Sequence, residues 1–330
     1  MPRVAVIQGG PSSEASVSRV SAQAVAAGLL AAGHIPTLLE LGKSLPGELG
    51  QGAFDVVFPV VHGALGEDGC LSGLLEILEL PYVGSGVLAS ATAMDKHRSK
   101  QLFRLEGLPL AEDVLARRGD DVRETVQRAR AKLGPAVVVK PITQGSALGV
   151  SVLSASRTDD DVAAALEEAF RFDDLVLLEA RIEGREVTCG VTDVAALGGL
   201  RALPPTEIVP ESAEFYDFKA KYGAGGSRHV CPAILPDGVS DEVRAVAVAA
   251  HRLLGCRDLS RADFIVGTGS HEGRLVLLEV NTMPGMTATS LYPEAMDRAG
   301  VPFARMCDEL VRAALDRGGR RAVPIPAMPG

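Results

Sequence analysis

The 330-residue sequence contains no tryptophan, and aromatic residues make up only 4% of it although 47% of its residues are hydrophobic. Alanine, valine and leucine must therefore build the core, and a chain of this length suggests two or three domains. No apolar run is long enough to cross a membrane. Because the chain enters a strand pattern directly at residues 3–7, we expect neither a signal peptide nor a membrane partner.

Paired cysteines and blocks of like charge are missing as well. The five cysteines are scattered and include no CxxC pair, which indicates reduced thiols in a cytoplasmic protein and argues against a disulfide framework or a zinc site. The net charge of −9 is spread along the chain, so we do not expect a nucleic acid partner. Only seven of the 33 basic residues are lysine. Each lysine is therefore a candidate phosphate ligand, although an ordinary surface role remains the simpler interpretation for any one of them.

The usual nucleotide-binding fingerprints are also absent. A strand, a glycine turn and a helix occupy residues 3–30, but the turn lacks the GxGxxG pattern, so a dinucleotide is weakly supported. A second strand ends in Lys140, and the small-residue loop 143–150 returns to another strand without the GxxxxGK[ST] pattern of a Walker A loop. Such a loop exposes backbone N–H groups that can cover phosphates. A plain hairpin turn is the alternative.

Two polar residues stand where α/β proteins often bind ligands. His62 opens the glycine-rich loop 62–69 after the strand at 54–61, which is where open α/β sheets place ligands. It could orient a carboxylate or have a purely structural role. Glu14 stands at the start of the first helix, where it could stabilise the helix dipole or bind a substrate ammonium.

Acids and an amide flank two short apolar runs near the end of the chain, at residues 264–266 and 275–278. Asp263 precedes the first run, and Glu279 and Asn281 follow the second at a spacing of two, so they point the same way if the strand continues. Mg²⁺ prefers such oxygen ligands. We predict a hairpin that presents a Mg-nucleotide site, and an edge hairpin with solvated acids is the alternative.

Another acid pair, Glu179 and Glu186, follows the strand at 175–178 and could hold ribose hydroxyls or be surface charge. Segment 214–222 lies between proline-rich and glycine-rich neighbours, which predicts a mobile loop over a site. We expect a first domain boundary near residue 95. The other expected strands lie at 35–41, near Tyr82, at 187–194 and at 198–203, and the expected helices at 71–80, 87–105, 159–169, 241–254 and 302–317.

The order of these motifs resembles that of the D-alanine–D-alanine ligases of the ATP-grasp superfamily over nearly the whole chain. The segments that carry the resemblance are GGPSSEASVS, HGALGEDG, SGVLASATAMDKHRSK, VVVKPITQGSALGV, LLEARIEGREVT, FYDFKAKY, RADF and LLEVNTMPGMTATSL. The resemblance implies an α/β, three-domain ATP-grasp fold with an N-terminal open parallel-sheet domain. The implied domains are an N-terminal substrate-binding domain, a central ATP-grasp subdomain and a C-terminal subdomain with the metal and substrate sites, at residues 1–95, 96–184 and 185–330.

The resemblance also implies an activity and a partner. ATP would phosphorylate the carboxylate of one D-alanine, and the amine of a second D-alanine would attack the acyl phosphate. The products would be D-alanyl-D-alanine for peptidoglycan precursors, ADP and phosphate. A homodimer is implied as well.

The matching family positions assign roles to individual residues. Two Mg²⁺ ions, with Mn²⁺ as a substitute, would be held by Asp263, Glu279 and Asn281. The implied ATP ligands are Lys96, Lys140, Ser146, Ala147, Glu179, Arg181, Ile182, Glu186 and Lys221. The implied substrate and catalytic groups are Glu14 and His62 for the first D-alanine, Arg261 and the Gly285 N–H for the oxyanion, Ser290 and Leu291 for the second carboxylate, and a triad of Glu14, Ser146 and Tyr222.

The residue at 222 bears on specificity. The related D-alanine–D-lactate ligases usually carry histidine there, so Tyr222 favours an amine nucleophile and predicts a dipeptide. Ala147, Ala180, Lys219 and Met283 depart from the common family pattern, which allows a paralogue that accepts another second substrate such as D-serine or resists an inhibitor. A nucleotide-binding regulator that has lost catalysis is a third hypothesis, and the intact metal ligands argue against it.

Overall fold

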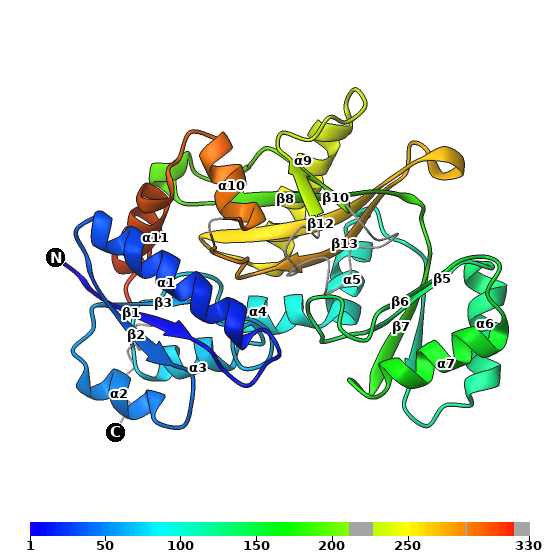
Figure 1. Ribbon diagram of the computed structural model, residues 1–330, viewed down its shortest axis with the longest axis horizontal. Helices are drawn as coiled ribbons and strands as arrows, with labels where there is room; N and C mark the ends of the chain where they lie inside the picture. The colour runs from blue at the N-terminus through cyan, green and yellow to red at the C-terminus, as the bar shows by residue number, and fades with distance from the viewer. Residues whose placement is uncertain (211–226, 288, 320–330) are drawn as a thin grey trace, which may run out of the picture.

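The computed structural model describes residues 1–210, 227–287 and 289–319. Within these ranges the strands form three sheets of three, four and six strands. Figure 1 shows the three-stranded sheet on the left, the four-stranded sheet on the right and the six-stranded sheet across the upper middle. No helix in the described part of the chain combines the length and the apolar character needed to cross a membrane.

The N-terminal sheet is parallel, with strand order β2-β1-β3. Val4, Ala5, Val6 and Ile7 of its central strand are fully buried, as expected for a parallel strand that is covered on both faces. The expected strand near Tyr82 is reduced to a single bridge with Val57. The elements of this layer are β1 (Arg3–Gln8), α1 (Ala15–Ala31), β2 (Ile35–Glu40), α2 (Leu45–Gln51), β3 (Val56–Pro59) and α3 (Cys70–Ile77).

The expectation of one continuous helix over residues 87–105 is wrong. The structure has two helices, α4 (Val87–Met94) and α5 (Lys96–Leu105). Asp95 between them has an extended backbone, and its carboxylate accepts a hydrogen bond of 2.9 Å from the backbone N–H of Arg98. A side-chain cap of this kind starts a new helix. Because the chain turns at Asp95, α5 takes its own direction and carries its lysines toward the other two sheets.

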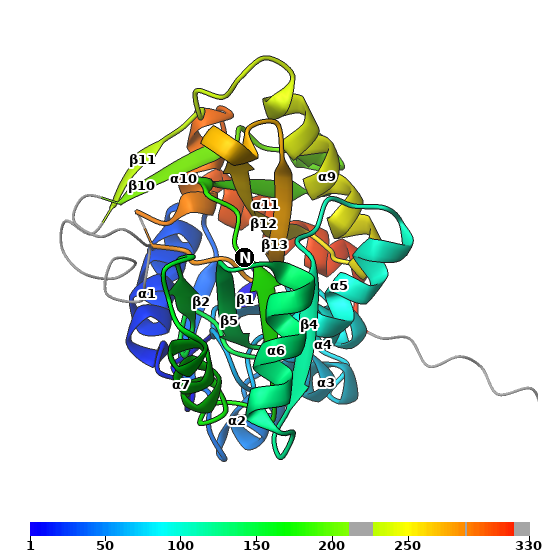
Figure 2. The ribbon, with the colours of Figure 1, turned by 90° about the vertical axis from the view of Figure 1, so that its right-hand side faces the viewer.

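The central sheet is antiparallel, with strand order β4-β7-β5-β6. The helices α6 and α7 pack side by side on one of its faces (Figure 2). The opposite face is left for the cavity described below. The elements of this layer are β4 (Asp113–Arg117), α6 (Val122–Leu133), β5 (Val137–Pro141), β6 (Ser151–Leu153), α7 (Asp159–Ala169) and β7 (Leu175–Ala180).

The C-terminal sheet is antiparallel, with strand order β11-β10-β8-β12-β13 and β9 paired to β8. The predicted hairpin is confirmed as β12 and β13. The expected strand at 198–203 shortens to two residues, because a 3-10 turn and Gly198 in a left-handed conformation precede it. The elements of this layer are β8 (Gly184–Thr192), η1 (Ala195–Leu197), β9 (Arg201–Ala202), β10 (Thr206–Pro210), β11 (Ser227–Val230), α9 (Val239–Leu254), β12 (Leu259–Gly267), η2 (Gly269–His271) and β13 (Leu275–Asn281).

The last two helices, α10 (Leu291–Arg298) and α11 (Phe303–Arg317), return the chain to the N-terminal layer. α11 packs against α1 (Figure 1), and Leu29 and Leu310 belong to one buried cluster. Met283 and Met286, which lie between β13 and α10, are part of the same cluster. The segment that follows the β12–β13 hairpin therefore packs into the N-terminal core.

Candidate active site

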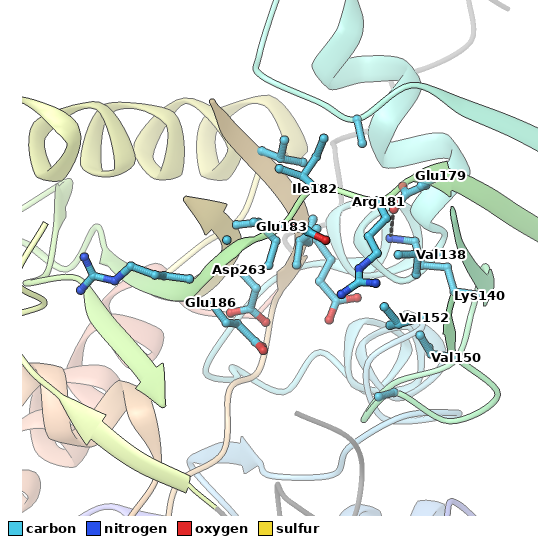
Figure 3. Close-up of a pocket in the computed structure, with 18 of the residues that line it drawn as sticks. Val138, Lys140, Val150, Val152, Glu179, Arg181, Ile182, Glu183, Glu186 and Asp263 are labelled. Carbon is cyan, nitrogen blue, oxygen red and sulfur yellow. Dashed lines mark ion pairs between the residues drawn. The ribbon is translucent and has the colours of Figure 1, made fainter. Parts of the chain in front are cut away.

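A cavity of about 570 Å³ lies between the central sheet and the C-terminal sheet. Its volume is within the range of small-molecule sites. In Figure 3, Lys140, Val150 and Val152 lie on one side of it, and Glu186 and Asp263 lie on the other. The residues of the sequence prediction that line it are Lys96, Lys140, Ala147, Glu179, Arg181, Ile182, Glu186, Asp263 and Glu279.

Glu179, on β7, is a buried carboxylate between two ammonium groups. The Lys140 Nζ lies 2.7 Å from its Oε2, and the Lys100 Nζ binds its Oε1. Burial alone would raise the pKa of this carboxyl, but the Lys140 and Lys100 charges outweigh burial and hold the pKa below its ordinary value. Glu179 is therefore an anion with a fixed position at the cavity wall.

The predicted metal ligands Asp263, Glu279 and Asn281 lie at the end of the β12–β13 hairpin. Arg261 is directly opposite Asn281 in the antiparallel register, and Asp263 is directly opposite Glu279. Since residues two apart on a strand share a face, the four side chains gather on one side of the sheet. The strand does continue through Asn281, as the spacing of Glu279 and Asn281 required.

Asp263 is held from three sides. The Arg261 guanidinium binds it in a bidentate manner, with both nitrogen-to-oxygen distances at 2.8 Å. Asn281 Nδ2 donates to its Oδ2 at 3.0 Å, and Thr188 Oγ1 donates to its Oδ1 at 2.6 Å. Glu279 is paired with Lys96, whose Nζ lies 2.9 Å from Oε2. Two carboxylates and an amide thus converge with fixed orientations.

Lys96 also ties this hairpin to the small-residue loop. Its Nζ donates to the backbone carbonyl of Gln144 at 2.7 Å. In that loop Ser146 and Ala147 both have positive φ, at 51° and 58°. L-residues seldom adopt this conformation, and here it makes the tight turn that carries Ala147 to the cavity.

Glu14 does not use its side chain to cap α1, since no side-chain cap bond is made at that helix end. Its buried carboxylate instead accepts a hydrogen bond from the Ser146 hydroxyl. The structure thereby joins the N-terminal glycine turn to the small-residue loop. Tyr222, the third member of the expected triad, lies outside the described residues, as do Lys219 and Lys221.

His62 is buried close to Glu14 and Arg261. Burial lowers its pKa, and the Glu14 carboxylate opposes this effect only in part. Glu67, in the same glycine-rich loop, accepts a hydrogen bond of 2.6 Å from the Gly63 N–H. Burial, followed by the negative charge of Glu14, raises the pKa of Glu67 to about 8. The glycine-rich loop thus places a carboxyl of raised pKa next to Glu14.

Gly285 and Ser290 are in close contact before α10. A Cβ at Gly285 would lie 2.9 Å from Ser290 Oγ. This hydroxyl accepts from the Thr287 N–H at 3.0 Å, and Ser290 is the N-cap residue of α10. Leu291 begins the helix and packs on Ile208. The N–H groups at such a helix start can receive a carboxylate.

Sequence reasoning missed three residues of this site. Thr188 buttresses Asp263, Glu67 stands beside Glu14, and Lys100 binds Glu179. Lys100 was detectable in principle, because it follows Lys96 by one helical turn and lysine is rare in this chain. Met283, which the sequence marked as a departure beside the metal ligands, turns its side chain into the hydrophobic core against Gly84.

Comparisons with known proteins agree with this geometry. The profile described as D-ala D-ala ligase C-terminus matches residues 102–312, and the one described as D-ala D-ala ligase N-terminus matches residues 42–85. The D-alanine--D-alanine ligase of Geobacter sulfurreducens is 43% identical over 313 residues, 94% of each chain. That of Gluconobacter oxydans is 44% identical over 321 residues, covering 96% of this chain and all of the other.

Solved structures show the same similarity. The structure described as D-alanine--D-Alanine Ligase from Bacillus anthracis complexed with ATP superposes with a TM-score of 0.80 at 28% identity, covering 96% of this chain and 98% of that chain. Another structure of the Bacillus anthracis ligase gives a TM-score of 0.82 at 31% identity, with the same coverage. The expected α/β, three-domain ATP-grasp fold with an N-terminal parallel sheet is confirmed. This chain belongs to the D-alanine–D-alanine ligase family of the ATP-grasp superfamily.

Proposed function

We propose that this protein is an ADP-forming D-alanine–D-alanine ligase that supplies D-alanyl-D-alanine for peptidoglycan precursors. The single observation that carries the proposal is that the Asp263–Glu279 pair lines one cavity between two sheets together with Lys96, Lys140 and Ala147, the residue that follows the Glu14–Ser146 contact in the chain. The relatives named as D-alanine--D-alanine ligases match nearly the full chain. The site therefore serves transfer of the ATP γ-phosphoryl group to one D-alanine and attack by a second.

The nucleotide would lie in the cavity between the sheets. Lys96 and Lys140 supply positive charge for its phosphates, with Lys221 as a further phosphate ligand, and the turn at Ser146 and Ala147 supplies backbone N–H groups. Phosphoryl transfer depends mainly on positioning and on charge neutralisation. The remaining residues that we assign to the nucleoside are Glu179, Arg181, Ile182 and Glu186.

We assign two Mg²⁺ ions to Asp263, Glu279 and Asn281, and Mn²⁺ can replace Mg²⁺ at oxygen sites. The donor set fits, because all three side chains offer oxygen. Asn281 gives its amide nitrogen to Asp263, so its Oδ1 is the ligand atom. Bound metal would neutralise the phosphate oxygens during transfer.

The two D-alanine substrates would bind on opposite sides of the end of the β12–β13 hairpin. Glu14 receives the ammonium of the first D-alanine, with His62 beside it. The carboxylate oxygen of that D-alanine takes the γ-phosphoryl group and ADP leaves. The deprotonated amine of the second D-alanine then attacks the carbonyl carbon. Arg261 and the Gly285 N–H stabilise the tetrahedral oxyanion, which collapses with loss of phosphate.

The second D-alanine would be held by its carboxylate at the start of α10, where Ser290 and the Leu291 N–H face it. We assign Tyr222 to the expected triad with Glu14 and Ser146, and a tyrosine at that position favours an amine nucleophile. A different second substrate, such as D-serine, remains an alternative because of Ala147 and Ala180 at the cavity wall. Met283 no longer supports it, since its side chain is core.

Phosphate release should be measured with D-alanine alone and with D-alanine together with D-serine, D-lactate or L-alanine, with products identified by mass spectrometry. We expect D-alanine alone to give the dipeptide. Release with none of them would contradict the enzyme assignment, and formation of a depsipeptide with D-lactate at neutral pH would contradict the role of Tyr222.

We further propose the domain division 1–95, 96–184 and 185–330, a homodimer and a cytoplasmic location. The helix break at Asp95 supports the first boundary, although α11 returns to pack on the N-terminal layer. The cytoplasm follows from the use of ATP as co-substrate. Light scattering of the purified protein tests the dimer.

A further inference from the structure

Lys100 is a buried lysine that no role in the proposed reaction uses. It lies on α5, one turn after Lys96, and its side chain is 2% exposed. Its ammonium binds Glu179 Oε1, lies 2.9 Å from Asp113 Oδ2 and donates to the Ala111 carbonyl at 3.1 Å. An ammonium group has three N–H donors, so these three partners satisfy it fully in a place that water does not reach.

These contacts belong to a chain of five alternating charges that runs from the surface to the cavity. The order is Arg104, Asp113, Lys100, Glu179 and Lys140. The Arg104–Asp113 distance is 2.7 Å and the Glu179–Lys140 distance is 2.7 Å. The outer end is half exposed, with 49% of the Arg104 side chain accessible, whereas 8% of the Lys140 side chain is accessible.

Three positive and two negative charges leave this chain with one surplus positive charge. Lys140, Glu179 and Ala111 form part of the cavity wall, and Lys100 stands behind them. Figure 3 shows the Lys140–Glu179 ion pair at the edge of the cavity. The cation at the inner end of the chain, Lys140, therefore faces the nucleotide cavity.

The number of cations on Glu179 decides how firmly that carboxylate holds Lys140. A buried carboxylate with one cation binds it strongly, because the pair is poorly screened. A second cation on the other carboxylate oxygen neutralises part of the negative charge and so weakens the attraction of the carboxylate for the first cation. We propose that Lys100 is a positioning residue that neutralises Glu179 from behind the cavity wall, so that the Lys140 ammonium can pair with a nucleotide phosphate. A purely structural Lys100 would stabilise the fold without any effect on nucleotide affinity.

This inference rests on the proposed nucleotide site, and the experiment separates the two. Dipeptide formation by the unaltered enzyme tests the ligase assignment. Calorimetric binding of ATP with Mg²⁺, measured without D-alanine, tests Lys100 whether or not ligation occurs.

The first variant is Lys100→Met, which keeps most of the length of the side chain and removes its charge. Each acid keeps one cation, since Asp113 retains Arg104 and Glu179 retains Lys140, so we expect this variant to fold. The Kd for ATP should rise about tenfold, the size of one charge-assisted hydrogen bond, and the KM for D-alanine should stay within about twofold. Arg98→Met is the matched control, because Arg98 is an exposed cation on the same helix, and it should leave both constants unchanged.

Two further variants test whether Lys100 acts on ATP binding through Glu179. In a Glu179→Gln background there is no anion to compete for Lys140, so adding Lys100→Met should have no further effect on the Kd for ATP. Asp113→Asn removes the competitor for Lys100 and should tighten ATP binding by about threefold. General disruption of the fold would weaken binding in every variant.

The inference is overturned by any of three results. One is a Kd for ATP that Lys100→Met leaves unchanged. Another is an equal loss from Lys100→Met with and without Glu179→Gln. The third is weaker ATP binding in Asp113→Asn.

Discussion

The Ser146 hydroxyl donates a hydrogen bond to the Glu14 carboxylate, although 132 positions separate the two residues in the sequence. Glu14 belongs to the N-terminal glycine turn, and Ser146 belongs to the loop whose next residue, Ala147, lines the nucleotide cavity. The bond therefore connects the expected ammonium subsite of the first D-alanine to the phosphate-covering loop. Binding of D-alanine at the ammonium subsite should therefore favour an ordered phosphate-covering loop, and binding of ATP under that loop should favour an ordered subsite.

Ser146→Ala should lower kcat/KM for D-alanine by about tenfold, because the buried Glu14 carboxylate loses a hydrogen bond worth about 1.5 kcal/mol. Steady-state kinetics with varied D-alanine measures this. Ser156→Ala, at an exposed serine beyond the same loop, is the matched control and should keep wild-type kinetics. Equal kinetics for Ser146→Ala and wild type would show that the contact has no role in turnover.

Asp263→Asn should lower kcat by about a hundredfold and weaken metal binding, because a neutral amide replaces an anionic oxygen ligand. Arg261 would also lose the carboxylate that orients it. Mn²⁺ binding followed by electron paramagnetic resonance gives a readout that does not depend on turnover. Asp241→Asn, at an exposed position of α9, should change neither quantity. Undiminished Mn²⁺ binding in Asp263→Asn would remove this residue from the metal site.

The β12–β13 hairpin was predictable because its information is local. Two apolar runs and polar residues at a spacing of two predict strands and a shared face, and the structure pairs Asp263 with Glu279 directly across the ladder. The role of Glu14 was not predictable from its own segment. An acid at the start of a helix has a local explanation in the helix dipole. Its contact with Ser146 was implied only by the family resemblance, and the structure places the two side chains together.

The helix break at Asp95 and the position of Lys100 show the other limit of sequence reasoning. The residues from 87 to 105 favour helix throughout, and a single capping hydrogen bond from the Arg98 N–H to the Asp95 carboxylate marks where one helix ends and the next begins. The partners of Lys100 come from other strands and loops, 11 and 79 positions away. Such contacts follow from sheet order, which local propensity does not encode.

Asp258→Asn should lower the free energy of unfolding by about 3 kcal/mol, because it leaves the Arg317 guanidinium partly buried without its counter-charge. Arg317 binds both oxygens of Asp258, at 2.7 and 2.9 Å, and the Gly84 N–H donates to Oδ2 at 2.7 Å. Asparagine suits the positive φ of 64° at this position, so the change removes the charge and one acceptor oxygen without straining the backbone. Denaturant unfolding measures it.

Arg312→Met is the control for this prediction. Arg312 lies on α11, as Arg317 does, and pairs with Asp308, but the Arg312 side chain is 60% exposed. Exposed pairs contribute at most about 1 kcal/mol, so this variant should unfold close to wild type. Equal losses in Asp258→Asn and Arg312→Met would mean that the buried pair does not hold the N-terminal and C-terminal layers together.

The apo enzyme should lose stability as pH rises from about 4.5 to about 8 through the Glu67 carboxyl, whose folded pKa is about 8 against an ordinary 4.5. A raised folded pKa means that the folded state binds the proton more tightly. The stabilisation is complete below the unfolded pKa and is lost as pH rises through the folded one, with a slope of at most about 1.4 kcal/mol per pH unit. The lowered pKa of His62 acts in the opposite direction, so a single melting curve does not isolate Glu67.

The difference in stability between wild type and Glu67→Gln isolates the contribution of the Glu67 carboxyl. Glutamine keeps an oxygen for the Gly63 N–H and cannot ionise, so the variant should gain stability relative to wild type as pH rises from 5 to 8. Thermal melts in that range, with metal removed by a chelator, measure the difference. Glu106→Gln, at an exposed position after α5, should run parallel to wild type. If Glu67→Gln also ran parallel, Glu67 would be ionised in the folded enzyme, and the subsite beside Glu14 would carry one more negative charge than its raised pKa implies.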